Sequence, residues 1–254
     1  MRKGNIVRQR IPLMRIVSLA PSNTEILFAL GAEKEIIART AFCDYPEAAK
    51  GIKKTVDSSD IEEIRKLDAD LILTSTMQDK LANELEESGL PVAHLSPHSL
   101  KGIFNAINEI GDLTGKTDEA IKLVGWMSSE LEKIKSTPVE KKRLYIECWD
   151  DPPMVSGDWV PEIAEIAGAH YPLKAGRPSR EMSAEEIQEY DPEIIILSIC
   201  GKKVDKDIVQ KRAGWENLSA VKNKKVHVMD DSLLNRPGPR VVQACAILNQ
   251  LIIF

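Results

Sequence analysis

Side chains suited to binding a small molecule recur in this sequence directly after short apolar runs. Five such loops span residues 20–23, 43–45, 75–78, 149–151 and 233–236, and residues 177–180 form a further candidate segment. In open α/β sheets, ligands sit beyond the carboxyl ends of the strands. The pattern therefore predicts a ligand site in these loops. The candidate residues are Cys43, Asp44, Tyr45, Met77, Gln78, Trp149, Asp150, Arg180 and Arg236.

Two aromatic residues stand out among these candidates. Aromatic residues make up only 5% of the chain, yet Tyr45 and Trp149 both fall at predicted strand ends. Aromatic rings supply a large, stiff contact area with a polar tip, which suits a broad apolar ligand. The alternative for both is burial in a core. Cys43 has the same two interpretations, as a soft contact to a metal centre or as a small buried hydrophobe.

Motifs of common enzyme classes are absent. The chain has no G-x-x-x-x-G-K-[ST], G-x-G-x-x-G, G-x-S-x-G or H-E-x-x-H. His94 and His98 form H-x-x-x-H, but Pro97 and the preceding strand argue against the helical geometry that a shared metal needs. The four cysteines form no C-x-x-C. We therefore predict a non-enzyme with no catalytic residue, resident cofactor or metal.

Composition narrows the class of partner. The chain has 254 residues, 43% of them hydrophobic and 29% charged, with a net charge of -5. This excludes disordered and collagen-like chains and disfavours nucleic acid or an anionic membrane as the main partner. Residues 1–15 carry five basic side chains but no apolar run of signal-peptide length, and no stretch is long enough to span a membrane. We expect a monomer that binds a small molecule.

Hydrophobic periodicity predicts the elements that position the candidate loops. Strands are expected at 15–20, 35–42, 70–76, 91–96, 142–149, 193–200 and 225–230. Helices are expected from Pro21, with a Ser22–Glu25 capping box, and at 59–69, 78–89, 160–169, 182–191, about 205–218 and 241–254. Alternating strands and helices indicate parallel sheets covered by helices.

Residues 99–136 break this alternation with helical spacing throughout and no proline. They predict one long helix, or two helices interrupted near residues 115–117. The expected fold is α/β, with an N-terminal lobe at 14–98, a helical connector at 99–138, a C-terminal lobe at 139–254 and a ligand cleft between the lobes. The alternative for the middle segment is an ordinary helical hairpin packed on one sheet.

An internal repeat relates the two lobes. Residues 59–75 align without gaps on residues 182–198, each a short acidic helix that leads into a buried strand. The repeat places Glu62 and Glu185 in the first turn of equivalent helices. Acidic residues favour helix N-termini in any case. As a pair, however, they predict two symmetric acidic knobs suited to a two-fold symmetric basic partner.

The segment RIVSLAPSNTEILFALGA, followed in order by FCDYP, the repeat beginning at Glu62, WDDPPMVSG and NRPGPR, resembles the helical-backbone periplasmic binding proteins of ABC importers. The segments SLAPSNTE and CDYP are most similar to those of the cobalamin-binding branch. The resemblance implies two lobes on a rigid helix, little closure on binding, and a permease dimer bound through Glu62 and Glu185. It also implies that Arg236 contacts a corrin amide, a phosphate or a siderophore carboxylate.

The ligand expected from the resemblance is a cobalt corrinoid, bound as cargo. Tryptophans common in the cobalamin branch are missing here near 57–60 and at Ser179, and so is an acidic residue near Ser232. An iron siderophore or haem therefore remains an alternative ligand. Two other functions also remain: a cytoplasmic corrinoid carrier or sensor, favoured by the lack of an export signal, and a two-lobed metal-handling enzyme. The resemblance itself implies a periplasmic or extracellular location.

Overall fold

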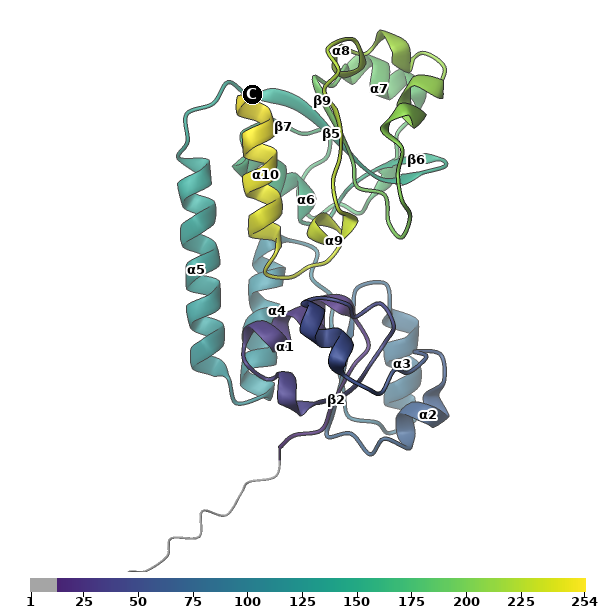
Figure 1. Ribbon diagram of the computed structural model, residues 1–254, viewed down its shortest axis with the longest axis vertical. Helices are drawn as coiled ribbons and strands as arrows, with labels where there is room; N and C mark the ends of the chain where they lie inside the picture. The colour runs from purple at the N-terminus through teal and green to yellow at the C-terminus, as the bar shows by residue number, and fades with distance from the viewer. Residues whose placement is uncertain (1–12) are drawn as a thin grey trace, which may run out of the picture.

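The computed structural model describes residues 13–254 as two α/β lobes beside a pair of long helices (Figure 1). The prediction that residues 1–15 contain no signal peptide concerns a segment that lies, up to residue 12, outside the described residues. The N-terminal sheet has the order β2-β1-β3-β4, and all its strands are parallel. Its strands are β1 (Ile16–Ser18), β2 (Ile36–Arg39), β3 (Leu71–Ser75) and β4 (Val92–Leu95).

The N-terminal helices lie where the periodicity predicts them, as α1 (Pro21–Ala29), α2 (Ile61–Arg65) and α3 (Asp79–Glu87), with short 3-10 turns at Glu33–Glu35 and Glu47–Gly51. The predicted Ser22–Glu25 capping box is wrong. Ala20 is the N-cap of α1 and makes no side-chain cap bond. Pro21 suits the first turn because it has no N–H to satisfy. Glu25 is thereby left to bind elsewhere.

The middle segment forms two helices, α4 (Leu100–Leu113) and α5 (Thr117–Lys135). The chain turns between them at Gly115, whose φ of +66° favours glycine. Helix α4 packs against α1 of the N-terminal lobe, and α5 packs against α6 (Val160–Ile166) and α10 (Val241–Ile253) of the C-terminal lobe (Figure 1). The segment is therefore two helices interrupted near residues 115–117, as predicted, and because they pack on different lobes it is not a hairpin on one sheet.

The C-terminal sheet has the order β10-β9-β5-β6-β8, with β7 beside β5. Strands β5, β9 and β10 are parallel to one another, as expected, and β6 pairs antiparallel with both β5 and β8. The chain reverses directly between Asp150 and Pro153, so β5 and β6 form a β-hairpin. The strands are β5 (Lys142–Asp150), β6 (Pro153–Val155), β7 (Ala169–His170), β8 (Arg180–Glu181), β9 (Ile194–Leu197) and β10 (Val226–Val228).

Helices α6 (Val160–Ile166), α7 (Ala184–Tyr190) and α10 (Val241–Ile253) match the predicted positions. The helix expected at about 205–218 is instead two 3-10 turns, Lys206–Lys211 and Trp215–Asn217. Gly214 separates them with a φ of +83°, which an α-helix cannot accommodate. Two further short helices, α8 (Ser219–Lys222) and α9 (Asp231–Leu234), lie on either side of β10.

Equivalent hydrogen bonds confirm the internal repeat. Ile16 pairs with Leu71 in the first lobe as Leu144 pairs with Ile194 in the second. The Arg15 backbone N–H donates to Asp70 at 2.7 Å, and that of Arg143 donates to Glu193 at 3.0 Å. Both arginines also donate from Nε to the carbonyl of a left-handed aspartate, Asp68 or Asp191.

One hydrophobic cluster joins both lobes to the helix pair. It includes Ile26 of α1, Ile107 of α4, Met127 of α5, Leu144 of β5 and Leu248 of α10. Because the interior of a protein is close-packed, this shared core resists sliding of one lobe against the other. None of the helices within residues 13–254 combines the length and the apolar character that a membrane span requires.

Alanine substitutions at two glycines are expected to change the free energy of unfolding in opposite directions. A Cβ on Gly157 would lie 2.3 Å from the Arg177 carbonyl oxygen, whereas one on Gly125, within α5, would meet nothing within 4 Å. Gly157→Ala should lower the free energy of unfolding by about 1–3 kcal/mol through overpacking. Gly125→Ala should raise it by about 0.5–1 kcal/mol through helix propensity. Urea titration of both variants measures this, and equal effects would contradict it.

Candidate ligand-binding site

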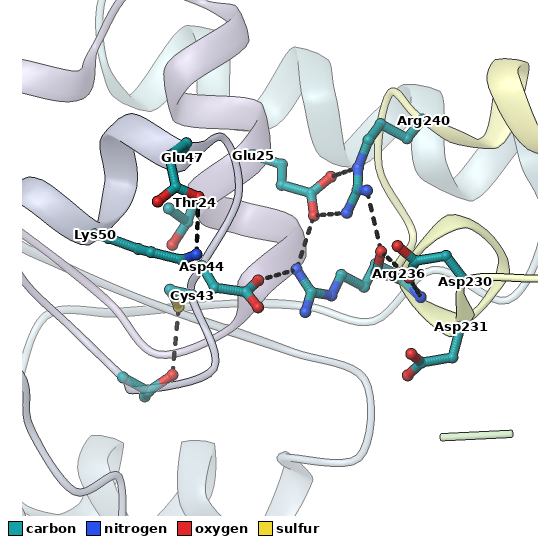
Figure 2. Close-up of polar contacts among 12 residues, drawn as sticks. Thr24, Glu25, Cys43, Asp44, Glu47, Lys50, Asp230, Asp231, Arg236 and Arg240 are labelled. Atoms are coloured by element: carbon teal, nitrogen blue, oxygen red, sulfur yellow. Dashed lines mark hydrogen bonds and ion pairs between the residues drawn. The ribbon is translucent and has the colours of Figure 1, made fainter. Parts of the chain in front are cut away.

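The carboxyl ends of the two sheets are linked by ion pairs across the lobe boundary. Helix α1 follows β1 and carries Glu25, and the loop after α9 carries Arg236 and Arg240 (Figure 2). Arg240 donates from Nε to Glu25 Oε2 at 2.8 Å and from Nη2 to Glu25 Oε1 at 2.5 Å. Arg236 Nη1 donates to Glu25 Oε1 at 3.1 Å and to Asp44 Oδ1 at 2.8 Å. We call these four residues the interlobe cluster.

The members of the interlobe cluster differ in burial. The Glu25 side chain is 3% exposed, Arg240 13% and Arg236 19%, whereas Asp44 is 49% exposed. Burial alone would lower the pKa of Arg236, but its hydrogen bonds to Asp44 and Glu25 raise it above the usual value, which keeps the guanidinium charged. The Glu25 contacts are thus desolvated, and the Asp44 contact is open to water.

Arg236 retains an unused donor edge. Its Nη1 makes both contacts within the cluster, while Nε and Nη2 form no hydrogen bond with residues 13–254. Neither atom is among the buried polar atoms without a partner, so each keeps some contact with solvent. A guanidinium edge of this kind binds a planar pair of oxygen acceptors, such as a carboxylate or phosphate.

Large apolar side chains are exposed near the same strand ends. The exposed fractions are 76% for Phe42, 44% for Tyr45, 97% for Met77, 44% for Trp149 and 50% for Val228. The first three come from the N-terminal lobe and the other two from the C-terminal lobe. Exposed apolar groups that form a patch are typical of a binding surface. These five side chains lie at or just after strand ends in both lobes, so they are candidates for contact with an apolar ligand.

Backbone strain marks one of these positions. Met77 has a φ of +67° in the loop after β3. This conformation is unfavourable for a bulky residue without glycine's freedom, and such strain clusters at ligand sites. The loop holds its shape because the Gln78 side chain accepts a hydrogen bond from the Ser75 N–H and donates one to the Leu19 carbonyl.

The family profile described as periplasmic binding protein matches residues 16–233. This chain belongs to the periplasmic binding protein family. The family comprises solute-binding proteins of ABC importers, not enzymes, so the metal-handling enzyme considered above is rejected.

Three relatives are similar to this periplasmic binding protein over most of its length. It is 29% identical to an uncharacterized ABC transporter substrate-binding lipoprotein of Bacillus subtilis, over 90% of this chain and 76% of the relative. It is 27% identical to a vitamin B12-binding protein of Vibrio campbellii, over 92% and 87%. The solved structure of a possible iron-binding periplasmic solute-binding protein of Staphylococcus epidermidis matches with a TM-score of 0.81 and 29% identity, over 94% and 98%.

In this periplasmic binding protein, several candidate residues have structural partners. Cys43 is fully buried with its thiol near the Thr40 hydroxyl and the Ser18 carbonyl, so it is the small buried hydrophobe of the two interpretations. The Arg180 fork is occupied by Glu186, at 3.0 and 2.9 Å, beside the first turn of α7. Gln78 uses its side-chain amide to bind the backbone of Ser75 and Leu19, so it shapes the loop.

Trp149 and Asp150 lie at the end of β5 against Lys202. The Lys202 ammonium lies 5.3 Å from the Trp149 ring centroid and 2.6 Å from Asp150 Oδ1. The indole N–H donates to the Asp151 carbonyl at 2.9 Å, which orients the ring. Trp149 therefore keeps an exposed face for a ligand, while the Asp150 charge is already neutralised.

Sequence reasoning missed Glu25, Phe42 and Arg240. Glu25 was assigned to a cap, and the partners that reveal its role lie 211 and 215 residues away. Arg240 carries a weak signal in the NRPGPR segment, as the second arginine after the last strand, and its guanidinium stacks 3.9 Å from the centroid of the Tyr45 ring. Phe42 could have been predicted, because it directly precedes the candidate loop at 43–45.

The two histidines contact different partners. His94 Nδ1 lies 2.8 Å from Thr74 Oγ1, whereas His98 Nδ1 lies 2.9 Å from Asp158 Oδ1. Within residues 13–254, no group of three or more His, Cys, Asp or Glu side chains is arranged to hold a metal ion.

Proposed function

We propose that this protein captures a corrinoid between its lobes and delivers it to an ABC importer. The observation that carries the proposal is the set of exposed apolar side chains at strand ends of both lobes, together with Arg236, whose Nε and Nη2 form no hydrogen bond with residues 13–254. A corrin is a broad apolar plate with polar groups at its rim. The vitamin B12-binding relative, similar over most of its length, supports this ligand class.

Titration with cyanocobalamin tests the ligand. Trp149 is half exposed and should cover one face of the plate, so Trp149→Ala should weaken binding by about 1–3 kcal/mol, the worth of a buried aromatic contact. Trp126, which is 51% exposed on α5, is the matched control, and Trp126→Ala should leave affinity unchanged. Calorimetry measures both. No binding by the wild type at high micromolar cyanocobalamin would reject the corrinoid.

A ferric chelate, such as a siderophore or haem, is the second candidate ligand. The iron-binding structural relative favours it, as does a guanidinium edge suited to a carboxylate. Haemin titration in the same assay separates the two classes. Tight binding of haemin without binding of cyanocobalamin would replace the corrinoid with an iron macrocycle.

We further propose that the ABC permease binds Glu62 and Glu185. Both side chains are exposed and both lie in the first turn of a helix, α2 or α7. The helix caps are also equivalent, because Asp60 accepts from the Glu63 N–H and Ser183 accepts from the Glu186 N–H. Two matched carboxylates suit a permease dimer with basic groups related by two-fold symmetry. In this proposal the protein acts as a monomer outside the cytoplasmic membrane.

A further inference from the structure

The two carboxylates that bind Arg236 differ in burial and in the number of hydrogen bonds they accept. Glu25 is almost fully buried and binds both arginines, with Arg240 held by two parallel hydrogen bonds. Asp44 is half exposed and makes a single contact, to Arg236 Nη1. Figure 2 shows Glu25 enclosed between the two guanidinium groups and Asp44 reaching Arg236 from a separate loop.

The geometry assigns opposite roles to these two acids: Glu25 is a positioning residue that locks the lobes together and presents Arg236, and Asp44 is an internal anion that the ligand replaces. Breaking a buried, bidentate pair leaves an uncompensated charge, so the Glu25 contacts persist when a ligand enters. An exposed single pair is worth little, so a polar group of the ligand can displace it.

The shape of the site supports replacement. The Asp44 loop also carries Tyr45, whose ring is held by the stacked Arg240 guanidinium. Asp44 can therefore leave Arg236 while its loop stays anchored. Because Nε and Nη2 of Arg236 form no hydrogen bond with residues 13–254, an acceptor group from a ligand can first bind that edge and then take the place of Asp44 at Nη1. The ligand class implied is one that presents an anionic or strongly polar acceptor beside an apolar body.

The ligand-free protein tests the role of Glu25. Spin labels at Asn83 on α3 and Glu189 on α7, both exposed, would report the distance between lobes in a Cys148→Ser/Cys200→Ser background. Glu25→Gln should broaden the distance distribution and lower the melting temperature. Asp44→Asn should change neither. An unchanged distribution in Glu25→Gln, or a broadened one in Asp44→Asn, would overturn the assignment.

A second test, which rests on the proposed function, measures whether changes at Asp44 and Glu25 alter ligand affinity in opposite directions. With cyanocobalamin or haemin as probe, Asp44→Asn should tighten binding by about 2- to 5-fold, because a competitor worth an exposed ion pair is removed. Glu25→Gln should weaken binding by about tenfold or more. Changes in the same direction would overturn the inference. Failure of both probes to bind the wild type would reject the proposed ligands, and the distance measurement would still decide the role of Glu25.

A second variant covers the case in which Glu25→Gln fails to fold. Arg240→Lys keeps the charge but loses the fork that grips both Glu25 oxygens. It should broaden the lobe distance less than Glu25→Gln and weaken probe binding by a smaller factor. A wild-type distance distribution in Arg240→Lys would show that the fork does not lock the lobes.

Discussion

Arg212→Met is expected to lower the free energy of unfolding by about 3–5 kcal/mol, the cost of removing one partner from a buried ion pair. Arg212 donates to both Glu147 oxygens at 2.7 and 2.8 Å, and the Glu147 side chain is fully buried in β5. The guanidinium also stacks 4.5 Å from the centroid of the Trp215 ring. Methionine keeps the apolar stem and removes the charge, so the decrease in the free energy of unfolding measures the cost of leaving Glu147 without its cationic partner.

The pH dependence of this loss has a definite sign. Burial raises the pKa of Glu147 above its usual value, and the bonds from Arg212 oppose that shift. Without Arg212 the folded-state pKa of Glu147 should rise further. A carboxyl with a raised folded-state pKa contributes stability below its unfolded pKa and loses it as pH rises through the folded pKa. The destabilisation by Arg212→Met should therefore be smaller at pH 5 than at pH 8.

Urea unfolding at both pH values measures this prediction. Lys80→Met is the matched control, because Lys80 is 92% exposed and pairs with Glu84 at 3.5 Å on the surface of α3. That change should cost at most about 0.5 kcal/mol at either pH. A loss for Arg212→Met as small as that of the control, or one that grows at pH 5, would show that Glu147 is not held as an ion.

Local elements of this fold are predictable because their causes are local. Pro21 begins α1 and Gly115 ends the first long helix, and each acts through its own backbone preference. The repeat was also predictable, since Asp68 and Asp191 occupy the same left-handed position after equivalent helices. Aspartate tolerates that conformation better than most residues. The α/β fold therefore followed from the sequence, whereas the short strands β6, β7 and β8 and the 3-10 turns within 205–218 did not.

The interlobe cluster was not predictable, because its causes are distant in sequence. Glu25 fits a local S-x-x-E pattern, and nothing near it in the chain indicates partners in the loop between α9 and α10. Arg180 shows the converse case. Its predicted loop position suggested a ligand, and in the folded chain it pairs with Glu186, six residues away. Pairing of charges depends on tertiary geometry that periodicity does not contain.

Reversing both docking charges, Glu62→Arg with Glu185→Arg, is expected to reduce stimulation of the importer's ATPase by about tenfold or more while ligand affinity stays at the wild-type value. Charges at the rim of an interface steer association and reject partners of like charge, so reversal should both remove attraction and add repulsion. The pKa of Glu185 is lowered by hydrogen bonds from its own backbone N–H and the Ser183 hydroxyl, so this carboxylate is ionised well below neutral pH.

The symmetry of the repeat sharpens this test. Glu62 and Glu185 follow equivalent caps, so the two single reversals should weaken docking to similar extents and the double reversal should weaken it more than either. Glu87→Arg, an exposed reversal at the end of α3, is the control and should have no effect. ATPase assays with the importer in liposomes measure all four variants. If one single reversal abolishes docking and the other has no effect, a two-fold symmetric partner is ruled out. Such a result would mean that the partner contacts only one of the two equivalent helices.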